Sequence, residues 1–415
     1  MTERRLDVLQ NSRRPVYVVW ELTLRCDQPC THCGSRAGSA RAREWSTDEA
    51  LSFVSDLAAL GAREVVLIGG EAYLHPGFLQ VVRALRAHDI RATMTTGARS
   101  IDADLAREMV RAGMQGVSVS IDGLEPTHDL IRASKGSFAN ALEALAHLRD
   151  AGIEQLSANT NINRVNRFEL EALYDVLRER GVRSWQVQLT TPLGRAADRA
   201  DMLLQPWDLI DLLPRIAALK ARAFDDGVLI QPGNNLGYFG PEEALLRSIS
   251  PAHADHWRGC QAGRFVLGIE SDGAVKGCPS LQSAVYVQGN ARETALRSLW
   301  NSPGPMQFAA DRTIDSLWGF CASCPFAPTC MGGCTFTAHA IMGRPGNNPY
   351  CHFRARSFAA RGLRERLVPV EPAPGEPFDN GRFELREEPI DDPDPTIEAP
   401  RAQLLKIRRA KSAAG

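Results

Sequence analysis

The segment that decides how the chain is interpreted is Arg25-Cys26-Asp27-Gln28-Pro29-Cys30-Thr31-His32-Cys33. Its three cysteines follow the spacing C-x3-C-x2-C. Three thiolates at this spacing hold three irons of a four-iron cluster and leave the fourth iron open for a ligand. The same triplet also fits half of a zinc site, because a structural zinc ion is usually held by four protein ligands. The triplet alone therefore leaves a cluster and a zinc site both open.

The composition is that of an ordinary water-soluble protein. The chain has 415 residues, enough for two or three domains, with 23% charged residues and a net charge of -1. This balance argues against a nucleic-acid or membrane-surface partner, and no stretch is apolar enough to span a membrane. The N-terminus lacks the apolar segment of a secretory signal, so we expect a cytoplasmic protein. Its ten cysteines are then expected to bind metal or act in catalysis.

Residues 15–191 alternate between short apolar runs and amphipathic segments. The predicted strands are 16–22, 65–68, 91–95, 117–121, 155–161 and 185–189, and the predicted helices are 46–61, 76–88, 102–112, 137–150 and 167–180. Ser46 and Glu49 predict a capping box at the start of the first helix. Strands joined by helices predict a parallel sheet. Because a full eight-unit barrel takes about 250 residues, we predict an α/β fold with a partial (β/α)6 TIM-like barrel.

Polar or glycine-rich residues follow these strands, at the edge where such folds place their active sites. They are the cysteine loop, Gly69-Gly70-Glu71, Thr95-Thr96-Gly97, Ser120-Ile121-Asp122-Gly123, Asn159-Thr160-Asn161 and the segment 186–190. Each of these taken alone is more simply explained as a turn or a cap. Together, at one pole of the barrel, they indicate a site that faces the three cysteines.

The rest of the chain divides into four parts. We predict a flexible N-terminus over 1–14, a bridging region over 192–255 and a cysteine-rich domain over 256–365, with a hairpin at 265–277. Residues 366–415 are first rich in proline and acidic residues and then basic. This composition predicts a disordered tail or a segment that docks onto a partner.

Seven further cysteines lie in the second half of the chain: Cys260, Cys278, Cys321, Cys324, Cys330, Cys334 and Cys351. The four from Cys321 to Cys334 follow the spacing C-x2-C-x5-C-x3-C, which lets several thiolates converge without long loops. Two interleaved zinc sites are the alternative, with His339 or His352 as a further ligand. A lone histidine is more often a surface or core residue.

On these cysteine spacings the chain resembles a radical S-adenosylmethionine (SAM) enzyme with a C-terminal SPASM domain, of the type that matures peptides or proteins. Cys26, Cys30 and Cys33 match the family's C-x3-C-x-aromatic-C motif, with His32 at the usually aromatic position. Cys260 to Cys351 match the SPASM pattern at all seven positions. The resemblance covers roughly residues 15–360. It implies that the first cluster cleaves SAM to a 5′-deoxyadenosyl radical, which abstracts a hydrogen atom from the substrate.

The resemblance also implies where SAM binds. Gly69, Gly70 and Glu71 match the segment that holds the SAM amino group, with Ala72 in place of the usual proline. The other implied contacts are Thr96 and Ser120 to the ribose or carboxylate, Asp122 to the same groups or only to a turn, Arg132 to the carboxylate or substrate, Asn159 at a strand end, and His32 against the adenine or cluster. For Arg132 a solvated side chain is the alternative.

Three [4Fe-4S] clusters are implied in the same way. Besides the SAM-binding cluster, Cys260, Cys278 and Cys334 would hold a proximal auxiliary cluster, and Cys321, Cys324, Cys330 and Cys351 a distal one. Many relatives place a further cysteine between the first two SPASM positions, and this chain has none there. We therefore expect an open iron or a non-cysteine ligand at the proximal cluster. Pro279 stands where sulfatase-maturing relatives carry an aspartate base, which disfavours a sulfatase-type oxidation.

Our first functional hypothesis is a radical SAM oxidoreductase that cross-links or oxidises a ribosomally made precursor peptide. Only about 15 residues precede the first strand, so leader recognition would need a separate leader-binding protein, the bridging region or the tail. An electron donor such as flavodoxin or ferredoxin is also expected. The alternatives are a small-molecule or cofactor-biosynthesis enzyme, such as a haem-modifying one, and a zinc-binding structural protein. The last leaves Gly69-Gly70-Glu71 unexplained.

Overall fold

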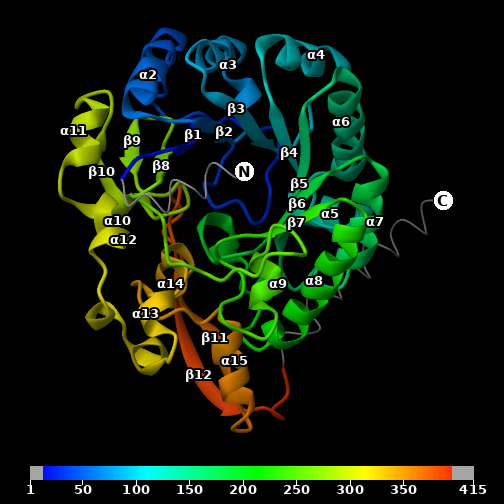
Figure 1. Ribbon diagram of the computed structural model, residues 1–415, viewed down its shortest axis with the longest axis vertical. Helices are drawn as coiled ribbons and strands as arrows, with labels where there is room; N and C mark the ends of the chain where they lie inside the picture. Colours follow the sequence, from blue (N-terminus) through cyan, green and yellow to red (C-terminus); the bar gives the residue numbers. More distant parts are fainter. Residues whose placement is uncertain (1–12, 395–415) are drawn as a thin grey trace.

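A ten-stranded sheet forms the centre of the structure, a computed structural model that describes residues 13–394 (Figure 1). The strand order is β10-β9-β8-β1-β2-β3-β4-β5-β6-β7. The strands β1 to β8 pair in parallel, whereas β9 and β10 are antiparallel. Their bounds are β1 (Tyr17–Thr23), β2 (Glu64–Gly69), β3 (Arg91–Thr96), β4 (Gly116–Ser120), β5 (Gln155–Ile162), β6 (Ser184–Leu189), β7 (Leu229–Pro232), β8 (Val266–Ile269), β9 (Ala274–Lys276) and β10 (Val287–Asn290).

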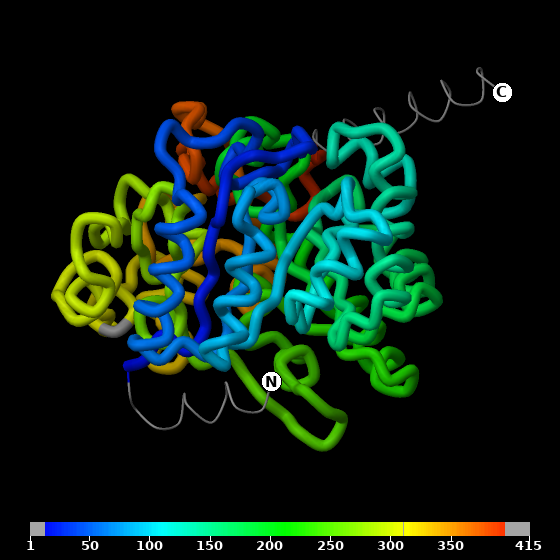
Figure 2. Tube along the Cα trace, turned by 90° about the horizontal axis from the view of Figure 1, so that it is seen from above, coloured from blue at the N-terminus to red at the C-terminus, as the bar shows by residue number. Residues whose placement is uncertain are grey.

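Helices cover the outer side of the parallel strands, as Figure 2 shows from above. They are α2 (Thr47–Leu60), α3 (Phe78–Ala87), α4 (Ala103–Ala112), α5 (Glu125–Arg132), α6 (Ser137–Ala151), α7 (Leu170–Glu179), α8 (Asp208–Asp225) and α9 (Glu243–Arg247). The α2 helix begins at the predicted capping box, in which the side chains of Ser46 and Glu49 each accept from the other's backbone N–H. It ends at Gly61, whose φ of 91° belongs to the left-handed region.

The two faces of β1 show how the sheet separates core from cavity. Val18, Trp20 and Leu22 are fully buried in the apolar core under the helices. The alternate residues Tyr17, Val19 and Glu21 line a cavity on the other face. Because successive side chains of a strand point to opposite faces, one strand serves both the core and the site.

The predicted six strand–helix units are all present, and the sheet remains open, as expected for a partial barrel. The sheet continues further than predicted. The bridging region adds β7 beside β6, and β8 from the cysteine-rich part pairs in parallel with β1. The predicted hairpin at 265–277 is confirmed as the antiparallel pair β8–β9. The short β7 was missed because its sequence, Leu-Ile-Gln-Pro, is neither alternating nor long.

The C-terminal part consists of short helices and one hairpin. The helices are α10 (Ser283–Tyr286), α11 (Leu296–Asn301), α12 (Phe308–Asp311), α13 (Ala327–Cys330), α14 (Thr335–Met342) and α15 (His352–Ala359). The hairpin consists of β11 (Leu363–Glu371) and β12 (Arg382–Pro389) and lies beside α14 and α15 (Figure 1). None of the helices between residues 13 and 394 is long and apolar enough to cross a membrane.

The prediction of a disordered tail from residue 366 is wrong for the residues up to 394, because this hairpin is ordered. Its charged residues pair across the strands: Arg364 and Arg366 lie 2.6 and 2.7 Å from the Glu388 carboxylate. Leu367 and Phe383 join the core. The composition was misread because alternating charge and apolar side chains also describe a two-faced hairpin. The remainder of that tail, and nearly all of the predicted flexible N-terminus, lie outside the described residues.

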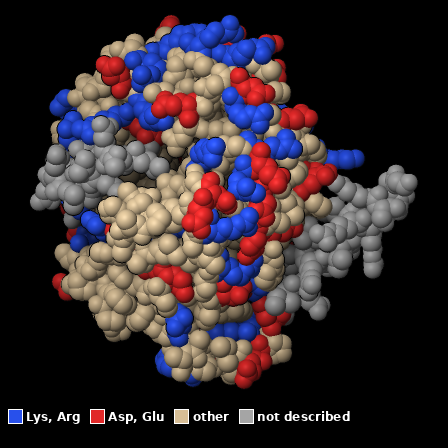
Figure 3. All heavy atoms as spheres, turned by 45° about the vertical axis from the view of Figure 1, so that its right-hand side comes forward, with Lys and Arg blue, Asp and Glu red and all other residues tan. Residues whose placement is uncertain are grey.

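Positive and negative side chains are interspersed over most of the face drawn in Figure 3. This mixing fits the net charge of -1.

Candidate active site

A cavity of about 860 Å³ lies along the inner face of the parallel strands. It reaches the carboxyl ends of the strands, where the cysteine loop closes over it. Of the residues predicted for the site, it is lined by Cys26, Cys30, His32, Cys33, Gly69, Gly70, Glu71, Thr96, Ser120, Arg132 and Asn159. Asp122 does not line the cavity and is fully buried. The six strand ends therefore meet at one pole, as the sequence indicated.

Backbone hydrogen bonds shape the cysteine loop. The Gln28 N–H donates to Cys26 Sγ at 3.4 Å, and the Ala37 N–H donates to Cys33 Sγ at the same distance. Burial raises the pKa of Cys26 to about 12, and the nearby Glu71, Cys30 and Cys33 add to this rise. A buried group of three thiols is costly to ionise on its own, whereas a bound metal stabilises the thiolates. The donor set therefore fits an iron–sulfur cluster.

Glu71 is held in one orientation beside this loop. The Thr96 hydroxyl donates to one oxygen of its carboxylate, and the Gly97 N–H donates to the other at 2.7 Å. Burial raises the pKa of Glu71 to about 8, although the bonds from Thr96 and Gly97 oppose this. A cationic amino group at this place would favour the charged carboxylate.

The two glycines before Glu71 have a structural reason. A Cβ on Gly69 would lie 2.0 Å from the Thr23 carbonyl oxygen, and one on Gly70 would lie 2.1 Å from that of Arg25. Both residues therefore let the end of β2 pass directly against the start of the cysteine loop. The Glu71 N–H then donates to the Arg25 carbonyl at 2.7 Å, which joins the two segments.

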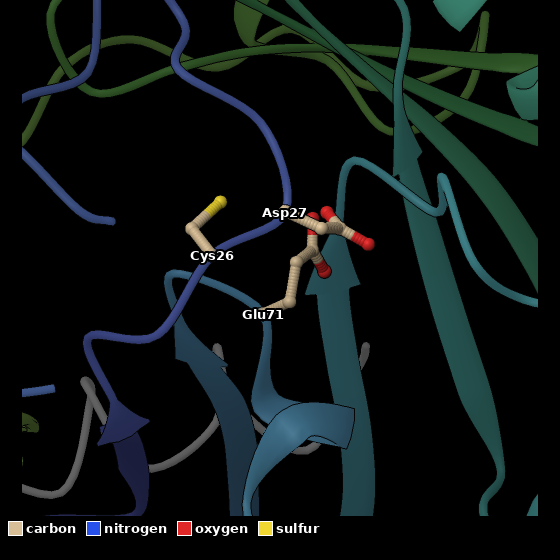
Figure 4. Close-up of side chains that lie close together, drawn as sticks. All are labelled: Cys26, Asp27 and Glu71. Atoms are coloured by element: carbon tan, nitrogen blue, oxygen red, sulfur yellow. The ribbon is translucent and has the colours of Figure 1, made fainter. Parts of the chain in front are cut away.

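Figure 4 shows that Asp27, which the sequence did not single out, lies next to Cys26 and Glu71. One ligand atom from each of these three residues lies within 4.8 Å of the others. The Asp27 carboxylate already accepts hydrogen bonds from the hydroxyls of Tyr73 at 2.8 Å and Ser100 at 2.7 Å. Asp27 therefore anchors the cysteine loop to the neighbouring strand ends.

Asp122 lies behind the cavity wall, where it contacts two other predicted site residues. Its carboxylate lies 2.7 Å from Arg132 Nη2 and 3.3 Å from His32 Nε2, and it accepts from the Asn161 N–H at 2.8 Å. Burial alone would raise the pKa of Asp122, but Arg132 and His32 outweigh burial and hold it well below its usual range. Arg132 in turn lies 3.6 Å from Cys30 Sγ. Asp122 thus orients Arg132 and His32, and Arg132 is not a solvated side chain.

Polar residues of two predicted strand ends, together with Gln28, which the sequence did not nominate, also face the cavity. Gln28 Oε1, Asn159 Oδ1 and Thr190 Oγ1 are buried and have no hydrogen-bond partner among residues 13–394. Buried polar atoms are nearly always paired, so these atoms fit a site that receives a polar ligand. Gln28 could have been found from its place inside the cysteine loop. Asn159 and Thr190 were already among the predicted strand-end residues.

The seven later cysteines form two groups. In the first, Cys278 interacts with Cys260 and Cys334, and burial together with these neighbours raises its pKa to about 12. Pro279 and Ser280 follow Cys278 directly and line the main cavity, as does Phe336. This group, the proximal group, therefore borders the same space as Cys26, Cys30 and Cys33.

The second group, the distal group, is enclosed separately. Cys321, Cys324, Cys330 and Cys351 line a small cavity of about 20 Å³. Four phenylalanines complete its wall: Phe239, Phe320, Phe326 and Phe353. Four converging thiols in an apolar enclosure fit a fully ligated cluster.

The two candidate zinc-ligand histidines make contacts with other side chains. His339 Nδ1 is hydrogen-bonded to the Tyr286 hydroxyl at 2.8 Å, and His352 Nδ1 lies 3.3 Å from the Glu242 carboxylate. This arrangement gives no support to a zinc scheme that uses them.

Comparison with known proteins agrees with this geometry. The radical SAM superfamily model matches residues 20–191, and the model of the SPASM iron–sulfur cluster-binding domain matches residues 260–325. The chain therefore belongs to the radical SAM superfamily and carries a SPASM domain, and it is an enzyme. These two domains imply iron–sulfur clusters and SAM as its cofactors.

Similar proteins act on different substrates. The AdoMet-dependent heme synthase of Nitratidesulfovibrio vulgaris is 26% identical over 82% of this chain and 92% of its own length. The mycofactocin maturase MftC of Mycolicibacterium smegmatis is 28% identical over 86% of this chain and 87% of its own. Among solved structures, Streptococcus suis SuiB bound to the precursor peptide SuiA matches with a TM-score of 0.63 and 15% identity, over 84% of this chain and 78% of SuiB. The last similarity shows the shared fold.

Proposed function

We propose that the protein abstracts a hydrogen atom from a peptide, a ribosomally made precursor, and thereby cross-links or oxidises it. When bound, the clusters and SAM supply the electron transfer and the 5′-deoxyadenosyl radical, and the protein orients them and excludes water. We assign Cys26, Cys30 and Cys33 to the SAM-binding cluster, and the proximal and distal groups to two auxiliary clusters. A flavodoxin or ferredoxin would deliver the electron, and a separate protein would bind a leader peptide.

We assign the amino group of SAM to Glu71, whose carboxylate is fixed by Thr96 and Gly97. Arg132, held by Asp122 beside Cys30, would meet the SAM carboxylate. The geometry supports this assignment because the carboxylate of Glu71 and the guanidinium of Arg132 lie on two sides of the three cysteines. They can therefore bind the ammonium and the carboxylate of the amino-acid part of SAM. The predicted roles of Ser120, Asn159 and His32 remain predictions, supported by their place on the cavity wall.

The lining of the cavity is the reason for proposing a peptide substrate. The inward side chains of β4, β5 and β6 are largely neutral amides and hydroxyls: Ser118, Ser120, Gln155, Ser157, Asn159, Asn161, Ser184, Gln186 and Gln188. Amides and hydroxyls both donate and accept, so they complement the alternating N–H and C=O groups of a peptide backbone. This lining is the observation on which the proposal depends.

The positively charged side chains that line the cavity also favour a peptide over a tetrapyrrole. The cations that line it within the described residues are Arg63, Arg91 and Arg132. Arg132 pairs with Asp122, Arg91 bonds the Gln155 side chain at 2.9 Å, and Arg63 also has a partner. We assign Arg132 to SAM, and Arg63 and Arg91 already have partners, so the described lining offers little positive charge for the several carboxylates of a tetrapyrrole.

The second candidate function is the modification of a haem-type tetrapyrrole. It is favoured by the similarity to the AdoMet-dependent heme synthase, which extends over 92% of that protein. The cavity of about 860 Å³ is large enough for either substrate.

One experiment separates the two functions. Full-length protein, reconstituted without oxygen, is incubated with SAM and dithionite, and 5′-deoxyadenosine is measured alone, with peptides encoded beside the gene, and with an iron tetrapyrrole. We expect peptide to stimulate 5′-deoxyadenosine formation and to change mass. Turnover of the tetrapyrrole with no peptide modified would overturn the peptide assignment, and no 5′-deoxyadenosine under any condition would overturn the shared chemistry.

A further inference from the structure

The loop between β11 and β12, residues 372–381, reaches back to the cysteine loop, and we call it the strap. We propose that the strap is a wall of the active-site cavity and that Phe378 is a specificity-determining residue that packs against an apolar part of the substrate. The strap lies outside the segments matched by the two family models, which end at residues 191 and 325. The proposal rests on the proposed use of this cavity as the active site.

Three interactions fasten the strap to the SAM-binding side of the molecule. The Phe378 N–H donates, at 3.1 Å, to the carbonyl of Gly34, the residue directly after Cys33. The Gly194 N–H donates to the Asp379 carbonyl at 2.8 Å. The Asp379 carboxylate accepts from Arg36 Nε at 2.9 Å. The strap is therefore bonded to the same loop that carries the first three cysteines.

The segment that receives the strap is itself close to the cysteines. The Arg195 N–H donates to the Cys33 carbonyl at 3.0 Å. A Cβ on Gly194 would lie 2.3 Å from the Gly34 carbonyl oxygen and 2.5 Å from that of Cys33. The cysteine loop, Gly194 and the strap thus form one tight three-segment contact, which any movement of the strap would disturb.

The backbone of Phe378 has a conformation that is unfavourable for a residue with a large side chain. Its φ is 58°, a left-handed conformation that a bulky side chain rarely adopts. Such a conformation persists when the surrounding contacts determine it, and it is enriched at functional sites. The side chain is buried and lines the main cavity.

A lysine of the SPASM domain, Lys276, holds the Phe378 ring in place. Lys276 Nζ lies 3.6 Å from the ring centroid, and the same ammonium lies 2.7 Å from a Glu270 oxygen and donates to the Leu281 carbonyl at 2.7 Å. Lys276 is fully buried, so its interaction with the ring is shielded from water. Because Lys276 precedes Cys278 by two residues, Phe378 extends from the SAM-binding loop to the proximal group.

The cavity then has two different walls. Strands β4, β5 and β6 provide mainly amides and hydroxyls, whereas Leu193, Pro279, Phe336 and Phe378 provide an apolar surface, as do Val19, Val66 and Ile68 on β1 and β2. A substrate that places its polar groups against the strands must turn an apolar group toward Phe378. The same ring excludes water from the space between the first cysteines and the proximal group.

Three single variants of the full-length, reconstituted enzyme test this proposal. Phe378→Ala removes the wall, Asp379→Ala removes the ion pair to Arg36, and Glu376→Gln changes an exposed carboxylate of the same loop as a matched control. With SAM and dithionite alone, we expect Phe378→Ala to raise uncoupled 5′-deoxyadenosine formation about threefold or more, because solvent enters the cavity. Asp379→Ala should raise hydrogen exchange at the Phe378 and Gly194 amides about tenfold. Glu376→Gln should change neither quantity.

The substrate assay uses whichever of the peptide or tetrapyrrole turns over. We expect Phe378→Ala to raise KM about tenfold or more with a much smaller change in kcat, and Phe378→Leu to restore at least half of the affinity, on a logarithmic scale. Unchanged KM and unchanged uncoupled cleavage in Phe378→Ala would overturn the role of Phe378. If Phe378→Ala loses iron, Phe378→Leu and Asp379→Ala decide by the same two readouts. A wild-type enzyme that forms 5′-deoxyadenosine but modifies no peptide would overturn the peptide substrate alone.

Discussion

Two groups of three cysteines border the same cavity, and their surroundings differ. Cys26, Cys30 and Cys33 lie among charged side chains that are fixed by hydrogen bonds, chiefly Glu71 and the pair Asp122–Arg132. Around Cys260, Cys278 and Cys334, the residues that reach the cavity are Pro279, Ser280 and Phe336. Lys276 lies near that group and is already engaged by Glu270.

This difference teaches that three cysteines by themselves do not define a SAM site. An amino acid needs a carboxylate for its ammonium and a cation for its carboxylate. Among the described residues, the first group has both at the cavity, Glu71 and Arg132, whereas the neighbours through which the second group reaches the cavity are uncharged. If Cys260, Cys278 and Cys334 hold a cluster with an open iron, that position would therefore suit water, a protein side chain or substrate better than a second SAM. The distal group has four cysteines and its own enclosure of phenylalanines, so it is separate from both.

The largest expected effect distinguishes the two groups directly. Cys30→Ala should lower 5′-deoxyadenosine formation by more than about a thousandfold, because it would remove a ligand of the proposed SAM-binding cluster. Cys278→Ala should leave SAM cleavage within about tenfold while the enzyme loses about four irons. Chromatography of 5′-deoxyadenosine and iron analysis measure both. Equal loss of SAM cleavage in the two variants, with the first cluster intact in Cys278→Ala, would contradict the difference.

Next in size is the loss of a buried charge pair on each side. Arg132→Met removes the guanidinium beside Asp122, which keeps its contact with His32, and Lys276→Met removes the ammonium beside Glu270, which keeps its ion pair with Arg41. The loss should lower the free energy of unfolding of the cluster-free protein by about 3–5 kcal/mol in Arg132→Met, and by less in Lys276→Met because Arg41 still pairs with Glu270, in denaturant titrations.

Removing the partner carboxylate as well, in Arg132→Met with Asp122→Asn, should restore at least half of that loss. Only Arg132→Met, and not Lys276→Met, should also weaken SAM binding. If Lys276→Met weakened it equally, the proposed separation of SAM binding from the proximal group would be wrong.

A smaller effect is expected at Tyr238, which lies between the proximal and distal groups. Its hydroxyl accepts from the Cys334 N–H at 3.1 Å and donates to the Asn234 carbonyl, and its own carbonyl lies 3.8 Å from Cys351 Sγ. Tyr238→Phe leaves a buried N–H without a partner and should cost about 1–3 kcal/mol of unfolding free energy. Electron paramagnetic resonance should show altered auxiliary-cluster signals and an unaltered SAM-cluster signal. Tyr17→Phe, on the cavity face of β1, serves as the control.

The smallest effect concerns pH. The His128 ring accepts from the Asp122 N–H at 3.0 Å, and its Nε2 lies 3.0 Å from the Ser137 hydroxyl. Burial, assisted by Arg132, lowers the pKa of His128 to about 3. The unfolded chain therefore takes up a proton first as pH falls below about 6.5, and stability is lost toward about pH 3, by at most about 1.4 kcal/mol per pH unit.

His128→Gln should flatten this part of the stability profile, measured by denaturant titration between pH 7 and pH 5. His339 on the SPASM side is the matched comparison, because burial also lowers its pKa. We expect His339→Gln to flatten the profile less, since His339 is less deeply buried than His128. An unchanged slope in His128→Gln would show that other groups carry the acid sensitivity.

Much of the fold followed from local patterns. The apolar strands of the barrel and the Ser46–Glu49 capping box were predicted within a residue or two, because their signals depend only on neighbours in sequence. The hairpin of β11 and β12 was missed because its stability comes from cross-strand ion pairs such as Arg366–Glu388 and from burial against other elements. Asp27 was missed for the same reason, since its partners Tyr73 and Ser100 come from other strand ends.

The sequence by itself determined the chemistry that this protein can hold. Cysteine spacing is a local property, and the C-x3-C-x2-C triplet together with the spacing from Cys260 to Cys351 carried the resemblance to a radical SAM enzyme with a SPASM domain. Only the tertiary structure decided what faces those cysteines. The alignment of β4, β5 and β6 made a polar wall, and the strap brought Phe378 across more than 340 residues to Gly34. Contacts between distant segments depend on how the elements pack, and spacing along the chain does not encode them.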